Sequence, residues 1–254
     1  MDTALPAFAT SLFLHLVRTS AFMAVVPVFG RQRDSMFLRL VLALTMAVVF
    51  WWVGQQQVPL PGSVLALGVM AVREAVVGVA LGFAVLIITT VAVAAGEIVS
   101  TEMGFSMARA LDPESGSESS VMSQLFQVFA FLLILHFDLH HEVLRILEQT
   151  FRSIPVGAPF DLQPIWFGLR GLVAASLLLA LQYAFPVLGV MLLLTTALVL
   201  LGRAVPNINL MEFGYAARVL LALLAGAYFL AQGSPFLVRS FAGLLGSTRA
   251  MFPV

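Results

Sequence analysis

The sequence predicts an all-α protein embedded in a membrane, and three observations predict this class. Hydrophobic residues make up 61% of the 254 residues and charged residues only 10%, whereas a soluble domain carries about a quarter charged residues because its surface faces water. Several apolar runs reach the roughly 20 residues that a helix needs to cross a bilayer. The net charge is zero, so nothing attracts nucleic acid electrostatically.

The first two apolar runs predict two helices joined by a short basic loop. The first run covers residues 4–29. It has no basic segment before it and no small-residue cleavage site after it, so we expect a retained helix rather than a signal peptide. The second run covers 36–53, and the polar, proline-rich segment 55–62 that follows predicts a loop.

The third apolar run, 64–95, is too long for one perpendicular span. Arg73 and Glu74 are expected to divide it, and because adjacent residues point to different helix faces, each is expected to contact another helix. Gly78 and Gly82 stand four residues apart and form a small face that permits close approach of a second backbone.

Two shorter elements follow a polar central segment. Residues 121–137 predict an apolar helix, and 140–152 predict an amphipathic helix with its apolar side chains on one side.

The last third predicts a kinked helix, a turn and a final helix. The run 165–201 contains Pro186, which removes a backbone hydrogen bond and is expected to kink or break the helix. Residues 203–209 read as a turn, 213–231 as the last strong apolar run, and 236–254 as a mildly apolar tail.

The central segment 97–123 is the most polar part of the chain and lies between two strongly apolar helices. Irregular backbone at membrane depth occurs only where it is buried in protein or lines a cavity. One interpretation is a loop that folds into a pore and blocks it, and the other is an ordinary exposed connector. The apolar residues within it, such as Phe105 and Leu111, argue against full exposure.

Charged and histidine residues suggest partners rather than catalysis. Arg18 falls in the middle of the first apolar run, where an unpaired charge is costly. For Arg18, Arg73 and Glu74 we favour structural pairing over direct contact with a transported substrate. His136, Asp138, His140 and His141 form a cluster, and a helix could align His136 and His140 on one face because they stand four residues apart. A metal site would need a third firm ligand, so we favour a role at a helix end and expect no metal.

Motifs for enzymatic chemistry are not found. The chain has no Cys, which excludes thiolate catalysis and disulfides. It contains no zinc-protease, nucleophile-elbow or phosphate-loop motif. We therefore expect neither an enzyme nor a cofactor.

Five sequence blocks, in this order, resemble one known family: Arg18-Thr19-Ser20-Ala21-Phe22 with Pro27-Val28-Phe29-Gly30, Arg73-Glu74 with Gly78 to Phe83, Gly96-Glu97 with Met103 to Ser106 and Asp112-Pro113, Phe137 to His141 with Phe151 to Gly157, and Arg203 to Asn209. The chain is similar over nearly its whole length to the FliR family of flagellar biosynthesis proteins, with the SctT group of injectisomes as relatives.

This resemblance implies a core subunit of the flagellar type III protein export gate, in the bacterial inner membrane within the flagellar basal body. It implies a single copy of this chain in a complex with FliP-type and FliQ-type subunits, an FlhB-type switch protein and unfolded export substrates, in contact with lipid. It divides the chain into a FliP-like helical region, 1–164, and a FliQ-like helical pair, 165–254, with a non-standard membrane topology.

The resemblance also implies functional residues. It makes the segment 104–120 a pore plug, with channel residues Met103, Gly104, Phe105, Ser106, Met107, Arg109, Leu111, Asp112 and Pro113. Contacts between subunits are expected at Arg18, Arg73, Glu74, Gly78, Gly82, Arg203, Asn207 and Asn209. Two alternatives stay open: a gate subunit of an injectisome, and a small-molecule transporter with broken helices.

Overall fold

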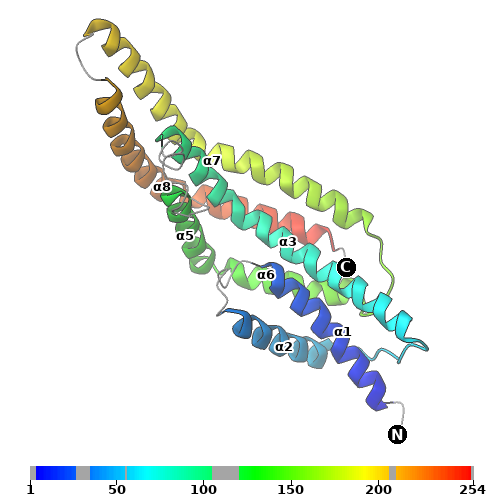
Figure 1. The fold of residues 1–254 in the computed structure, drawn as a ribbon. Helices are drawn as coiled ribbons and strands as arrows, with labels where there is room; N and C mark the ends of the chain where they lie inside the picture. The colour runs from blue at the N-terminus through cyan, green and yellow to red at the C-terminus, as the bar shows by residue number, and fades with distance from the viewer. Residues whose placement is uncertain (1–3, 27–34, 55, 105–119, 206–209, 253–254) are drawn as a thin grey trace. The chain divides into compact units, whose positions relative to one another are not determined.

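The computed structural model describes residues 4–26, 35–54, 56–104, 120–205 and 210–252. Within these ranges every regular element is an α-helix, which confirms the predicted all-α class. The helices are α1 (Ala4–Val25), α2 (Ser35–Gly54), α3 (Val64–Glu102), α5 (Val121–His136), α6 (Leu139–Ser153), α7 (Gln163–Ala204) and α8 (Leu210–Ala250) (Figure 1).

Local capping residues explain where several helices begin and end. The Ser63 hydroxyl accepts a hydrogen bond from the backbone N–H of Ala66 and so caps the start of α3. Two residues after α3 ends, Gly104 adopts a φ of 85°, a left-handed conformation that glycine adopts at little cost. Asp161 accepts from the N–H of Gln163 at the start of α7.

The expected division of the third run is wrong, because helix α3 continues without a break through Arg73 and Glu74. Of the two outcomes expected at Pro186, a break does not occur, since α7 continues through this residue. Helix α8 includes Pro235 and reaches Ala250, so the mildly apolar tail is helical as far as that residue. Proline is tolerated within long apolar helices because neighbouring groups and local adjustments satisfy the backbone that it frees.

The described chain forms two compact units that are discontinuous in sequence. The first contains residues 1–88, 139–173 and 243–254, and the second contains 89–138 and 174–242. The division at residue 164 implied by the resemblance concerns kinship to other subunits and stays a prediction.

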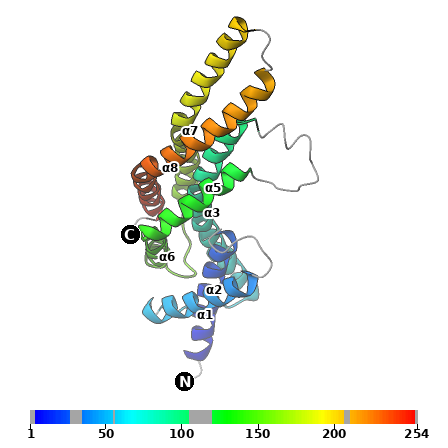
Figure 2. The same ribbon diagram turned by 90° about the vertical axis from the view of Figure 1, so that its left-hand side faces the viewer.

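In the first unit, α1 and α2 pack against each other, and both ribbon views show them side by side (Figures 1 and 2). The core of this unit is apolar, with Leu14, Phe22, Leu81, Ile146 and Leu147 at most 1% exposed. The last turn of α8 lies on α6: the Gln149 amide donates to the Phe252 carbonyl over 2.7 Å.

In the second unit, α7 and α8 run as an antiparallel hairpin (Figure 1). Tyr183 of α7 reaches so close to Gly233 of α8 that a Cβ there would lie 2.8 Å from its ring. The same tyrosine packs edge-on against Phe126 of α5, with ring centroids 5.7 Å apart. Glycine at 233 is therefore required by close packing.

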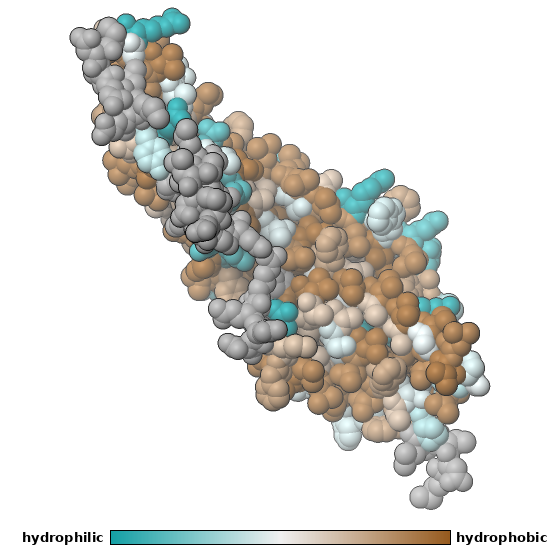
Figure 3. Space-filling model, in the orientation of Figure 1, coloured by the Kyte–Doolittle hydropathy of each residue, from teal (hydrophilic) through white to brown (hydrophobic). Residues whose placement is uncertain are grey.

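The helices leave much apolar surface uncovered. Among the described residues, five helices are long and apolar enough to cross a membrane, or up to six if α5 and α6 count as one bent span. In α2, α7 and α8 the apolar windows are only 11%, 17% and 22% buried. The space-filling view shows apolar side chains over most of one face (Figure 3). Surface of this kind is stable against lipid or against other apolar protein.

Candidate functional site

The first unit contains a buried ion pair, Arg18 of α1 with Glu74 of α3. The Nε atom of Arg18 donates to Oε2 of Glu74 over 2.6 Å, and the two side chains are 0% and 2% exposed. A buried charge is tolerated when a partner and further hydrogen bonds satisfy it. The expectation of structural pairing for these residues is confirmed.

The same two side chains hold the chain between α6 and α7. Arg18 donates from Nη1 to the Thr150 carbonyl over 2.8 Å and from Nη2 to the Ile154 carbonyl over 3.0 Å. Glu74 accepts from the N–H of Gly157 over 2.8 Å. The ion pair therefore ties α1, α3 and the end of α6 into one unit.

An aromatic ring completes the surroundings of Arg18. The guanidinium lies 4.4 Å from the centroid of the Phe151 ring, a cation–π contact. The His15 ring stacks on Phe151, with centroids 4.9 Å apart and an interplanar angle of 9°. Phe151 contacts both Arg18 and His15, and all three side chains are buried. Its ring is therefore part of the polar network as well as of the core.

Gln56, in the loop between α2 and α3, makes a second set of hydrogen bonds beside this ion pair. Its amide donates to the Phe151 carbonyl over 2.9 Å and accepts from the N–H of Val156 over 3.0 Å. The backbone carbonyl of Gln56 accepts a hydrogen bond from the Ser11 hydroxyl. The polar segment that the sequence identified only as a loop is thus held by specific bonds.

Gly78 and Gly82 lie directly against α1. A Cβ at Gly78 would lie 2.3 Å from the Arg18 carbonyl oxygen, and one at Gly82 would lie 2.9 Å from that of Phe22. The expected close backbone approach is confirmed, and the approaching helix belongs to the same chain.

The residues expected at subunit contacts therefore fall into three groups. Arg18, Glu74, Gly78 and Gly82 make the contacts just described within the first unit. Arg73 is half-buried and Arg203 is exposed at the end of α7. Asn207 and Asn209 lie outside the described residues. A role of any of these positions in assembly stays a prediction.

In the second unit, α3 and α5 meet where they enter and leave the central segment. Glu97 of α3 accepts from the hydroxyls of Ser120 and Ser123 over 3.0 and 2.7 Å. Ser120 also caps α5, since its hydroxyl accepts from the N–H of Ser123 over 3.1 Å. Gly96 permits this contact, because a Cβ there would lie 2.6 Å from the Cα of Ser123.

Of the expected channel residues, the structure describes Met103 and Gly104. Met103 is fully buried, and Gly104 lies near the ring of Tyr215 in α8, 3.6 Å from the position of a Cβ. The others, Phe105, Ser106, Met107, Arg109, Leu111, Asp112 and Pro113, lie outside the described residues. Sequence reasoning missed the Glu97–Ser120–Ser123 contact, although a carboxylate and two hydroxyls flanking one loop were its visible signal.

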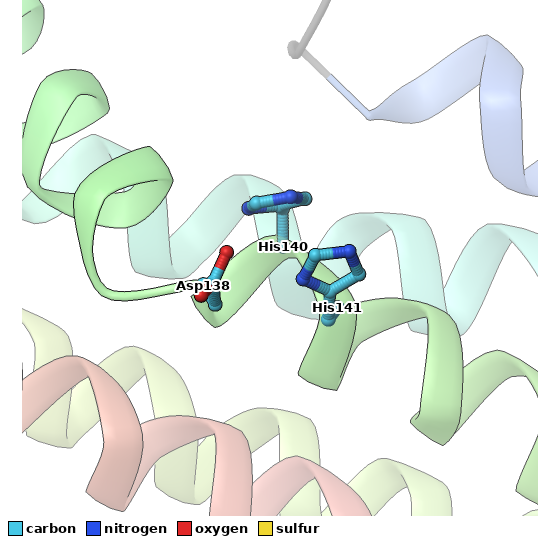
Figure 4. A group of neighbouring side chains, drawn as sticks. All are labelled: Asp138, His140 and His141. Atoms are coloured by element: carbon cyan, nitrogen blue, oxygen red, sulfur yellow. The ribbon is translucent and has the colours of Figure 1, made fainter.

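The turn between α5 and α6 brings together Asp138, His140 and His141. One potential ligand atom from each lies within 4.8 Å of the others. The three side chains lie close together at this turn (Figure 4). His136 ends α5 and the helix breaks at Phe137 and Asp138, so no single helix aligns His136 with His140. Asp138, which the sequence already places in the histidine cluster, supplies the third potential ligand atom.

Fold and site together define an all-α membrane protein with a buried Arg18–Glu74 ion pair and with Glu97 bonded to Ser120 and Ser123 across the two ends of its polar central segment. Comparison with known sequences supplies the particular family. Residues 9–246 match the bacterial export proteins, family 1, and the chain belongs to this family, that of the FliR proteins.

Curated relatives carry one name. The flagellar biosynthetic protein FliR of Bacillus subtilis is 28% identical over 221 residues, covering 84% of this chain and 82% of that protein. FliR of Escherichia coli is 28% identical over 232 residues, covering 90% and 87%. FliR of Caulobacter vibrioides is 26% identical over 223 residues, covering 85% and 89%.

Proposed function

We propose that the chain is a core subunit of the flagellar type III protein export gate and helps to form and close the channel for unfolded flagellar proteins. The observation that carries this proposal is the family match over residues 9–246, together with flagellar FliR relatives that align along more than four-fifths of their own length. The flagellar relatives favour a flagellar gate over an injectisome gate.

The uncovered apolar surface supports a role inside a larger assembly. A hairpin such as α7–α8, with apolar windows at most 22% buried, requires lipid or neighbouring subunits along most of its length. We propose FliP-type and FliQ-type subunits as those neighbours, an FlhB-type protein as a further partner, and the inner membrane as the location.

Co-purification tests the proposed partners. The chain, tagged at its natural locus and extracted in mild detergent, is expected to carry FliP-type and FliQ-type chains with it through gel filtration. A Gly78→Val variant should reduce recovery of the complex, because a larger side chain against α1 disturbs the fold of the chain that its partners bind. Recovery of the wild-type chain alone, as a folded monomer in detergent, would contradict the proposal.

We further propose that the segment 104–120 closes the channel at rest. Support comes from its two ends, where Glu97 holds Ser120 and Ser123 and Met103 is buried. With both ends fixed in this way, we propose that the stretch between them is the part that a passing substrate displaces.

A deletion tests this closure. Replacing residues 105–119 with a short glycine–serine linker is expected to raise ion leak through the reconstituted complex. The control replaces the segment 158–162, between α6 and α7, with a linker of equal length, which should leave leak unchanged. Unchanged leak after the first replacement, in a complex that still assembles, would refute the role of the segment.

A further inference from the structure

The turn between α5 and α6 carries a donor set that the proposed gate function does not use. Asp138, His140 and His141 fall within four consecutive positions, so their arrangement is determined by the turn itself. Their potential ligand atoms, one carboxylate oxygen and two imidazole nitrogens, lie within 4.8 Å of one another. Figure 4 shows the three side chains gathered around the start of α6.

The backbone at this turn has an unusual conformation. Asp138 has a φ of 55°, and it is the one non-glycine residue among those described with a positive φ. Its N–H donates to the Leu135 carbonyl over 3.2 Å, closing the end of α5. Glycine is the usual residue at such a position because a side chain there costs conformational free energy, and Asp is among the few other residues that adopt it. A strained residue that carries a carboxylate points to a use for the carboxylate.

His140 supplies an independent observation. Its Nδ1 atom is buried and has no hydrogen-bond partner among the described residues. Buried polar atoms are nearly always satisfied, and an exception in a native structure requires an explanation such as an ion. The ring of His141 lies beside it, with centroids 4.1 Å apart, so a second imidazole lies at the same point.

We propose that Asp138, His140 and His141 bind one divalent transition-metal ion of the zinc type. Two imidazoles and one carboxylate suit Zn²⁺, which takes nitrogen and oxygen ligands at about 2.0–2.2 Å and often keeps a fourth position for water. Calcium and magnesium prefer oxygen ligands alone. Ligand atoms around tetrahedral zinc are about 3.3 Å apart, so binding requires the three ligand atoms, now within 4.8 Å of one another, to move closer together.

The bound ion would join Asp138, in the turn after α5, to the first turn of α6. Because it holds Asp138 and both histidines at once, it would stabilise the left-handed turn. Metal binding should therefore be measurable both as stoichiometry and as protection of the folded chain. This inference does not depend on the proposed gate function.

The test uses the full chain, purified in detergent with a tag that contains no histidine, stripped with a chelator and titrated with Zn²⁺. The variants are Asp138→Asn, His140→Ala and His141→Ala. His136→Ala is the matched control, because His136 is an exposed histidine in the last turn of α5 and stands outside the ligand group. Circular dichroism establishes that each variant keeps its helicity, and Co²⁺ substitution gives a visible absorption band that reports ligand geometry.

We expect about one Zn²⁺ for each wild-type chain and each His136→Ala chain, with affinity at least about 100-fold weaker in each of the three ligand variants. We also expect a tetrahedral Co²⁺ spectrum that these three variants lose. The proposal is overturned if the wild-type chain binds no Zn²⁺ above background. It is equally overturned if helical ligand variants bind Zn²⁺ as the control does, which would mean an adventitious ion only.

Discussion

Nε of Arg18 donates to Oε2 of Glu74 over 2.6 Å, although the two residues stand 56 positions apart in the chain. Both side chains are buried, and each makes further bonds to the backbone between α6 and α7. One ion pair thus determines how three helices of the first unit meet.

Removing one member of this pair should lower the free energy of unfolding more than removing both members does. Arg18→Ala or Glu74→Ala leaves a buried charge without its partner, which costs about 3–5 kcal/mol. The double variant Arg18→Met, Glu74→Leu should recover most of that loss, since apolar residues of similar volume replace a buried ion pair well. Denaturant unfolding in detergent, monitored through the helical content, gives the free energy of unfolding of the wild-type chain, the two single variants and the double variant.

Arg152→Ala is the control for this series, because its ion pair with Glu148 is exposed. Exposed pairs contribute about 1 kcal/mol or less. Equal destabilisation by Arg152→Ala and Arg18→Ala would contradict the importance assigned to the buried pair.

Gly78→Ala should separate α1 from α3. The new Cβ would lie 2.3 Å from the Arg18 carbonyl oxygen, an atom of the backbone that has little freedom to move. Gly68→Ala is the matched change in the same helix, because nothing lies within 4 Å of a Cβ there, and it should be neutral or stabilising by up to about 1 kcal/mol. Thermal unfolding of the two variants checks this, and equal midpoints would show that the close approach is not required.

Glu97→Ala should loosen the base of the central segment. It removes the acceptor of both the Ser120 and the Ser123 hydroxyls, while the cap from Ser120 to the Ser123 N–H stays in place. We expect faster hydrogen exchange at the first turn of α5 and a higher resting ion leak of the assembled complex.

Ser234→Ala is the control, because this exposed hydroxyl donates to the Ala231 carbonyl of its own helix. If the two variants show the same hydrogen-exchange rates at the start of α5 and the same resting ion leak, Glu97 does not position the segment.

Gln149→Ala should release the end of α8. Gln149 donates to the Phe252 carbonyl and accepts from Nε of Arg249 over 2.8 Å. Loss of both bonds should make trypsin cleave after Arg249 several-fold faster, since proteolysis follows local opening. Glu148→Ala, the neighbouring change, should leave the cleavage rate at that site unchanged, and equal rates for the two variants would contradict this account.

Sequence reasoning predicted the helical class and the positions of most helices because long apolar runs and proline-rich loops are strong signals. It predicted a break at Arg73 and Glu74 because it treated charges as interruptions. The break is not needed, since Glu74 is satisfied by Arg18 and by the N–H of Gly157. A periodic pattern shows which side of a helix is buried, but not which residue lies opposite.

The turn at Asp138 was harder still to predict. The two histidines beside it were evident in the sequence, but the left-handed conformation that brings the carboxylate to them is not a property of residue type. The same holds for Gln56, whose three contacts are with α1, with α6 and with the loop that follows α6.

The central claim is that the chain closes a conduit with its polar central segment, and cysteine accessibility tests it most directly. The chain has no native Cys, so Met107→Cys gives a single label site within the segment, and Arg145→Cys gives a control on the exposed face of α6. In the assembled complex at rest, a bulky water-soluble maleimide should label Met107→Cys far more slowly than Arg145→Cys, and a substrate stalled in the gate should change the rate. Equally fast labelling of both positions, with or without substrate, would contradict the account.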